Sequence, residues 1–186
     1  DSFYLGTGEP QFRNIMPNLM YLNQGGKKFV DVSRASGLGH LQKGHAIAFA
    51  DFDNDGDQDI FEQMGGGYLG DKFFDAFFEN EASAKSWVNV RLIGTKSNRS
   101  AIGARIRVDI DARAVYKWVN SGGSFGANPL RQNIGLGDAR KINRLEVYWP
   151  TTGETQQWTE VPLNCFLQIT EGEDQLQLVS TKEIDL

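Results

Sequence analysis

The chain has little cysteine and no long apolar run. Cys165 is the only cysteine among 186 residues. A single cysteine excludes an internal disulfide and a cysteine-rich zinc site, and the adjacent Phe166 favours an ordinary buried thiol over a reactive one. No stretch approaches the roughly 18 consecutive apolar residues that a membrane-spanning helix needs. The sequence therefore predicts no membrane span.

Clusters of Lys and Arg are also missing, which argues against a nucleic-acid partner. The formal net charge is −5. Five of the acidic residues fall between positions 51 and 59, and without them the chain would be formally neutral. The acidity therefore marks one site and is not spread over the surface as a long-range field.

Helical periodicity is weak, and strand signals dominate. Short runs rich in Val, Ile, Phe, Tyr and Trp are separated by Gly, Asn and Asp. The expected strands are 29–32, 46–50, 87–93, 104–110, 115–120, 145–149 and 166–170. The only segments with a helical pattern are residues 10–19 and 71–78. Because 40% of the residues are hydrophobic, a packed core is expected, and we predict an all-β chain.

Residues 51–59 carry the most specific chemical pattern, with aspartate at alternate positions and glycine at the sixth. The aspartates are Asp51, Asp53, Asp55, Asp57 and Asp59. Carboxylates crowded into one turn repel each other unless a cation lies among them. Several hard oxygen ligands and a glycine at the sharp turn favour Ca²⁺. We expect side-chain ligands from Asp51, Asp53 and Asp55, the backbone carbonyl of Asp57, and a closing carboxylate from Asp59.

The same stretch also fits the EF-hand pattern, because Glu62 falls at position 12 counted from Asp51. An EF-hand needs a helix on each side of the loop. Residues 46–50 suit a strand, and the glycine run 65–67 would end an exit helix after about one turn. A metal-free acidic turn explains five alternating carboxylates poorly, although turns favour Asp, Asn and Gly. We therefore favour a calcium loop between two strands.

The sequence contains an internal repeat. Residues 1–6 resemble residues 59–64, and residues 18–23 resemble residues 75–80, at offsets of 58 and 57. On this alignment Asp1 corresponds to the last aspartate of an earlier loop, so the sequence is expected to begin inside an array of repeats. The polar segment 81–86 is the expected junction. We predict a repeat region over 1–85 and a second β domain over 86–180, followed by a tail, residues 181–186, that frays.

The first region resembles an FG-GAP/VCBS-type repeat, the blade unit of integrin-like β-propellers. The resemblance covers residues 19–80 and rests on the blocks 22–32 and 35–38 and on the acidic loop. It implies an incomplete propeller with Ca²⁺ bound in a structural role. A whole propeller needs several blades, so the upstream blades are expected to be missing from this sequence. Open sheet edges would then need cover.

The second region is similar to the ASPIC/UnbV domain over residues 98–171. The matching blocks are 98–105, 121–126, 134–137, 145–150 and 168–171, in the expected order. The turn after Trp149 and Pro150 is longer than is usual in this family, which affects the local turn only. We expect a β-sandwich or barrel-like domain, with a hairpin between 145–149 and 154–161.

Together the two resemblances imply a non-enzymatic, calcium-binding recognition or adhesion module that is secreted, periplasmic or at the cell surface, with a protein or glycan ligand. Ser121, Ser124 and Cys165 lack a nucleophile elbow or a nearby histidine partner, so catalysis has little support. Two alternatives stay open. One is a carbohydrate-binding module that uses the tryptophans, Trp87, Trp118, Trp149 and Trp158, although such residues more often pack in a core. The other is a set of accessory domains of a larger enzyme.

Overall fold

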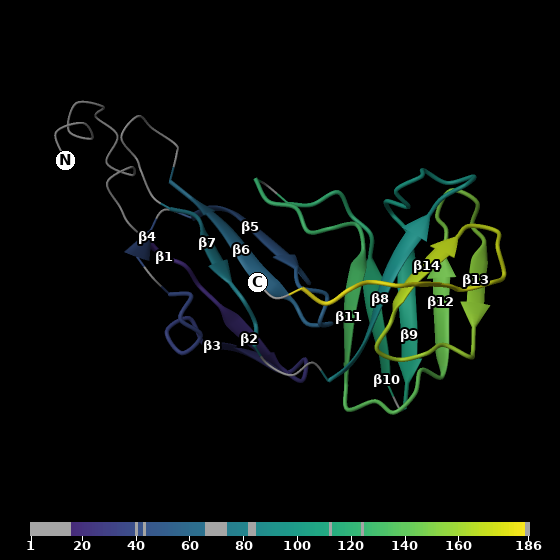
Figure 1. The fold of residues 1–186 in the computed structure, drawn as a ribbon, viewed down its shortest axis with the longest axis horizontal. Coiled ribbons are helices and arrows are strands. Elements are labelled where there is room, and N and C mark those ends of the chain that lie inside the picture. The colour runs from purple at the N-terminus through teal and green to yellow at the C-terminus, as the bar shows by residue number, and fades with distance from the viewer. Residues whose placement is uncertain are drawn as a thin grey trace. The chain divides into compact units, whose positions relative to one another are not determined.

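The computed structural model describes residues 16–39, 41–42, 44–65, 74–81, 85–111, 113–123 and 125–184, which form fifteen strands and no helix (Figure 1). The prediction of an all-β chain is confirmed, and no sheet of these residues closes into a barrel. The helices considered for residues 10–19 and 71–78 are wrong where they can be compared, because Met16–Pro17 is strand β1 and Ala76–Phe78 is strand β7. Pairing with a neighbouring strand overrides a weak local pattern there. Residues 10–15 and 71–73 lie outside the described residues.

The chain divides into two compact units. One contains Asp1–Ile47 and Glu62–Ala76, and the other contains Ala48–Phe61 and Phe77–Leu186. The acidic loop, residues 51–59, therefore belongs to the compact unit that also holds the C-terminal strands. Residues 1–6, which the sequence aligns with residues 59–64, lie outside the described residues.

The first unit contains short strands. They are β1 (Met16–Pro17), β2 (Tyr21–Gln24), β3 (Lys28–Asp31) and β4 (Leu41–Gln42), paired as β1–β4 and β2–β3. The β2–β3 hairpin turns at Gly25 and Gly26, whose φ angles of 62° and 74° lie in the left-handed region that glycine adopts without strain. The Asn23 side chain accepts the Gly26 N–H at 2.8 Å and fixes the turn.

A three-stranded sheet frames the acidic loop. Its order is β5 (Gly44–Ala50), β6 (Asp59–Met64), β7 (Ala76–Phe78). Strand β5 enters the loop and β6 leaves it, so a strand stands on each side. This confirms the expected strand–loop–strand arrangement and is incompatible with an EF-hand, which needs two helices.

The C-terminal strands form a sandwich of two four-stranded sheets. The first sheet has the order β10-β9-β12-β13, and the second has the order β11-β8-β14-β15. The first-sheet strands are β9 (Arg105–Ile110), β10 (Arg113–Trp118), β12 (Arg144–Tyr148) and β13 (Thr155–Trp158). The second-sheet strands are β8 (Ser86–Ile93), β11 (Gln132–Gly137), β14 (Phe166–Thr170) and β15 (Gln177–Val179). All seven strands expected from the sequence are present, and the expected hairpin is β12–β13.

The core lies between the two sheets. Alternate residues of β9, among them Ile106 and Val108, pack against Val88 and Val90 of β8, and all four are fully buried. Alternation places the other residues of β8 on the outer face of the second sheet. Trp87 and Asn89 therefore face away from this core, yet they are only 8% and 1% exposed. Something other than the sandwich core covers them.

The tryptophans have different environments. Trp149 is fully buried, Trp87 is buried on the outer face of β8, and Trp158 packs partly buried against the core. Trp118 is 56% exposed. Cys165 is half-buried, short of the full burial expected, and burial raises the pKa of its thiol, as fits an unreactive cysteine.

A buried carboxylate closes one end of the sandwich. Glu171 is 3% exposed, and one of its oxygens accepts the backbone N–H groups of Thr95, Lys96 and Ser97 at 2.6–2.8 Å. Its other oxygen accepts the Ser97 hydroxyl at 2.8 Å. Burial alone would raise the pKa of Glu171, but these hydrogen bonds lower it to about 2. Glu171 thereby fixes the turn between β8 and β9.

No helix among the described residues has the length and apolar character needed to cross a membrane.

Candidate metal centre

The acidic loop is a tight turn between β5 and β6. Asn54 and Gly56 have φ angles of 64° and 103°, so the backbone turns through the left-handed region twice. Asparagine tolerates this region and glycine occupies it freely. A β-carbon at position 56 would overlap the indole of Trp87. Glycine is required there for its backbone conformation and for its close approach to β8.

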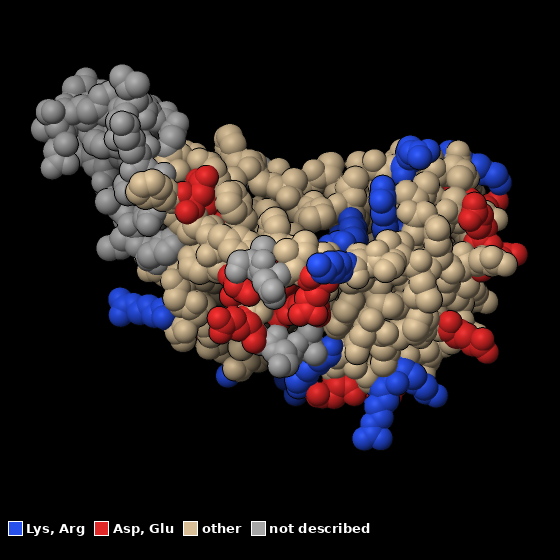
Figure 2. All heavy atoms as spheres, in the orientation of Figure 1, with Lys and Arg blue, Asp and Glu red and all other residues tan. Residues whose placement is uncertain are grey.

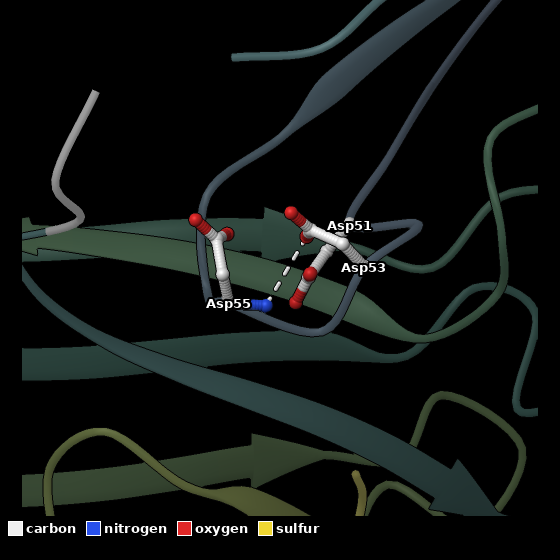
Figure 3. A group of neighbouring side chains, drawn as sticks. All are labelled: Asp51, Asp53 and Asp55. Carbon is white, nitrogen blue, oxygen red and sulfur yellow. Dashed lines mark hydrogen bonds between the residues drawn. The ribbon is translucent and has the colours of Figure 1, made fainter. Parts of the chain in front are cut away.

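Three carboxylates gather inside the turn. Asp51, Asp53 and Asp55 each offer an oxygen, and these oxygens all lie within 4.8 Å of one another (Figure 3). The backbone N–H of Asp55 donates to the Asp53 carboxylate at 3.2 Å, drawn as a dashed line. The N–H of Asp57 donates to the Asp55 carboxylate at 2.9 Å. Asp53 and Asp55 thus each hold the backbone two residues ahead, which keeps alternate side chains on the inside of the turn.

Asp59 lies at the base of the loop and has backbone partners. Its two oxygens accept the N–H of Phe52 and the N–H of Asn80, both at 3.0 Å. It is 1% exposed. Asp59 ties the start of the loop to the segment that follows β7, and it is not among the three residues whose oxygens converge.

Two carboxylates of the loop are buried without hydrogen-bond partners. Both oxygens of Asp51 and both oxygens of Asp57 have this property. Burial raises the pKa of Asp51. Burial and the charges of Asp55, Asp59 and Asp53 raise the pKa of Asp57 to about 6, although the nearby Asn80 side chain opposes this. Buried anions that repel each other need a compensating cation.

The loop docks on the outer face of the second sheet. Asn133 of β11 pairs with Asn89 of β8, and its amide donates to the carbonyl oxygens of Gly56 at 3.1 Å and Asp57 at 3.4 Å. Gly56 lies against Trp87. The loop therefore covers the face that the sandwich core leaves open, and it explains why Trp87 and Asn89 are buried.

Arg131 and the C-terminal segment hold the rim of the loop. The Arg131 guanidinium donates to the Asp51 carbonyl at 3.2 Å and lies 4.9 Å from the centre of the Phe166 ring. Ile184 donates its N–H to the Asp53 carbonyl at 2.8 Å. The expectation that the tail frays is therefore wrong up to Ile184, and residues 185–186 lie outside the described residues.

The arrangement suits a hard cation with oxygen ligands. The converging oxygens come from Asp51, Asp53 and Asp55, and the unpartnered Asp51 oxygens fit the chemistry of a calcium ligand set. No histidine or cysteine belongs to this group among the described residues, which argues against a zinc-type site. On the face drawn in Figure 2, acidic side chains gather with basic side chains beside them.

Sequence reasoning did not identify the residues that seat the loop. Trp87, Arg131 and Asn133 are separated from the loop by some 30 to 80 positions in the chain. None of them forms a motif with the aspartates, because their proximity is created by the folding of β8 and β11. No signal in a single sequence would have identified them.

Comparison with known families gives two matches. Residues 2–62 match the family of FG-GAP-like repeats, and residues 94–176 match the family described as ASPIC and UnbV. A comparison with curated proteins gives no match. Residues 94–176 cover most of the sandwich, from the end of β8 to the segment before β15. The chain thus carries an FG-GAP-like repeat followed by an ASPIC/UnbV domain.

Proposed function

We propose that the chain is a non-enzymatic recognition module in which the β5–β6 loop binds Ca²⁺ in a structural role. The observation that carries this proposal is the pair of buried, unpartnered carboxylates, Asp51 and Asp57. A bound cation would compensate the charge of these buried oxygens.

The bound ion would fix the shape that the loop needs for docking. The side chains of Asp51, Asp53 and Asp55 would hold it from inside the turn, and calcium supplies the positive charge that offsets their repulsion. The outside of the same turn contacts Trp87 and Asn133 of the ASPIC/UnbV sheet. Calcium would therefore stabilise the loop and the sheet together.

This role favours a location where calcium is abundant. Calcium sites in extracellular modules have dissociation constants of about 10⁻⁴–10⁻³ M, and the calcium concentration outside cells is high enough to fill such sites. We therefore propose that the protein is secreted, periplasmic or at the cell surface.

Thermal unfolding in calcium and in EDTA tests the metal proposal. An ion that binds only the folded state adds about 2.7 kcal/mol when its concentration is 100 times the dissociation constant. We expect calcium to raise the melting temperature of the wild-type protein by several degrees. Asp51→Asn should abolish this rise, whereas Asp138→Asn, an exposed aspartate on another turn, should leave it unchanged. A calcium response that survives Asp51→Asn would refute the site.

A glycan is a second candidate ligand for the module. Trp118 and Tyr116 of β10 stack with their ring centres 6.1 Å apart and an angle of 26°, and both are exposed. Arg107 of β9 lies over the Tyr116 ring at 5.8 Å. Flat aromatic surfaces with polar neighbours on a sheet face suit stacking on sugar rings.

Glycan-array binding tests this candidate. Trp118→Ala should remove any glycan signal, and Phe74→Ala, which removes an exposed aromatic ring from the first unit, should not. A glycan signal unaffected by Trp118→Ala would exclude this face as the binding surface.

A further inference from the structure

A small polar pocket lies beside the acidic loop. Its volume is about 60 Å³, and it opens to solvent. Asn89 of β8, Asn133 of β11, Lys117 of β10 and Asn128 line it, together with Arg131. At roughly 10–15 Å³ for each water-sized group, the pocket holds about four to six non-hydrogen atoms.

The first unusual group in this pocket is Asn89. It is 1% exposed, and its side-chain oxygen has no hydrogen-bond partner. A buried amide oxygen without a donor costs about 1–3 kcal/mol. A ligand that presents an O–H or N–H group to the pocket would remove this cost.

The second unusual group is Lys117. On β10 it alternates with the exposed Tyr116 and Trp118 and shares its face with Val115, which packs against the core. Among the described residues no carboxylate forms an ion pair with its ammonium group. Burial lowers the pKa of Lys117. A half-buried cation without a counter-ion favours an anionic ligand.

Neighbouring groups add to the positive character of the pocket. Arg131 lines it as well, and the Asn128 amide oxygen already accepts the Phe49 N–H at 2.8 Å. Asp51 is the acidic residue on the pocket wall. A cation bound in the loop would offset the charge of Asp51 and leave the pocket positive.

We propose that this pocket binds a small carboxylate that carries a hydroxyl group, with the carboxylate toward Lys117 and the hydroxyl donating to Asn89. A free 2-hydroxy acid and a uronic acid residue of a polysaccharide both present this chemistry. The glycolate ion, with five non-hydrogen atoms, has about the size that the pocket accepts. Binding to the pocket does not require calcium in the loop. The predicted increase in glycolate affinity in the presence of calcium, however, rests on the proposed function of the loop.

Titrations followed by ¹H–¹⁵N NMR test the proposal, with glycolate, acetate and glucuronate as probes. The folded protein should bind glycolate more tightly than acetate, with shifts at the side-chain amides of Asn89 and Asn133. Stronger binding of glucuronate than of glycolate would indicate a saccharide source, and the reverse would indicate a free acid. If none of these probes shifts the Asn89 amide, in calcium or in EDTA, the proposal is wrong.

Two variants locate the binding. Lys117→Met removes the cation but keeps a long side chain, and it should weaken glycolate binding about ten-fold, the effect of losing one charged hydrogen bond. Lys141→Met, at an exposed lysine, is the matched control and should change nothing. Asn89→Leu should abolish the preference for glycolate over acetate. Undiminished glycolate binding by Lys117→Met would overturn the proposal.

Titration with glycolate in calcium and in EDTA distinguishes the proposed pocket from the proposed calcium loop. Glycolate should bind more tightly in calcium than in EDTA, because the two ligands share the wall that Asp51 forms. Equal affinity in both conditions, together with loss in Lys117→Met, would support the pocket and contradict a cation in the loop.

Discussion

Two buried carboxylates in the second unit, Glu171 and Asp57, have opposite surroundings, and their pKa values shift in opposite directions. Glu171 accepts three backbone N–H groups and a serine hydroxyl, and its pKa falls to about 2. Asp57 lies among other aspartates, its oxygens have no hydrogen-bond partner, and its pKa rises to about 6. The chain itself completes the Glu171 site. The Asp57 carboxylate has no such donors, and the proposed cation in the loop would supply the compensating charge from outside.

The largest expected loss of stability comes from disturbing the packing of the loop against β8. Gly56→Ala places a β-carbon in the Trp87 ring and forces a left-handed backbone on alanine. We expect a loss of about 3 kcal/mol in the free energy of unfolding, from overpacking and strain together. Gly153→Ala is the control, because that glycine has φ 73° but open space around it, and it should cost about 1 kcal/mol. Equal losses in chemical denaturation would show that the contact with Trp87 is unimportant.

Glu171→Gln tests the carboxylate whose hydrogen-bond donors all come from the chain itself. The amide keeps the shape of the carboxylate but weakens its hydrogen bonds, including one from the Thr152 hydroxyl, and turns one N–H toward another. We therefore expect a loss of about 2 kcal/mol in the free energy of unfolding. The loss should be the same in calcium and in EDTA, as measured by urea unfolding, because Glu171 does not face the loop. If calcium restored the stability of Glu171→Gln, the Glu171 site would not be independent of the loop.

The pH dependence of stability should have opposite signs at the two sites. The pKa of Glu171 is lower in the folded state than its usual 4.5, so its stabilisation is complete above about pH 4.5 and is lost as the pH falls toward 2. The pKa of Asp57 is higher in the folded state than its usual 3.8. Without metal, protonation of Asp57 should therefore stabilise the protein as the pH falls from about 6 to 4.

Melting temperatures in EDTA from pH 7 to 2.5 measure both effects. Asp57→Asn should remove the rise between pH 6 and 4 and should stabilise the metal-free protein at pH 7 by about 1 kcal/mol. It should keep most of the calcium response, because Asp57 is expected to bind through its backbone carbonyl. Glu171→Gln should remove part of the fall below pH 4.5. Unchanged profiles in both variants would contradict the assigned origins.

The smallest expected effect concerns the rim of the loop. Arg131→Met removes the hydrogen bonds to the Asp51 carbonyl and the Asn54 side chain but keeps an apolar contact with Phe166. We expect a loss of about 0.5–1 kcal/mol in EDTA, as for an ordinary hydrogen bond. The calcium affinity, measured by calorimetry, should fall only slightly. A complete loss of calcium binding would make Arg131 part of the site and not a support of its rim.

Much of the fold could be predicted from local pattern. The alternation of Ile106, Val108 and Ile110 with charged residues specifies a strand with one buried face, and β9 has that form. The segment 71–78 could not be predicted, because Ala76–Phe78 becomes a strand by pairing with β6 and not by its own preference.

The sequence alone determined the chemistry of the loop. Five alternating aspartates and a glycine specify a turn with carboxylates on its inner side, since both the turn and the side-chain alternation are local properties. Only the tertiary structure decided which carboxylates stay without partners. Asp59 is satisfied by Phe52 and Asn80, whereas Asp51 and Asp57 are buried where the loop meets β8 and β11. Burial and hydrogen bonding depend on residues brought together from distant parts of the chain, and no local pattern encodes them.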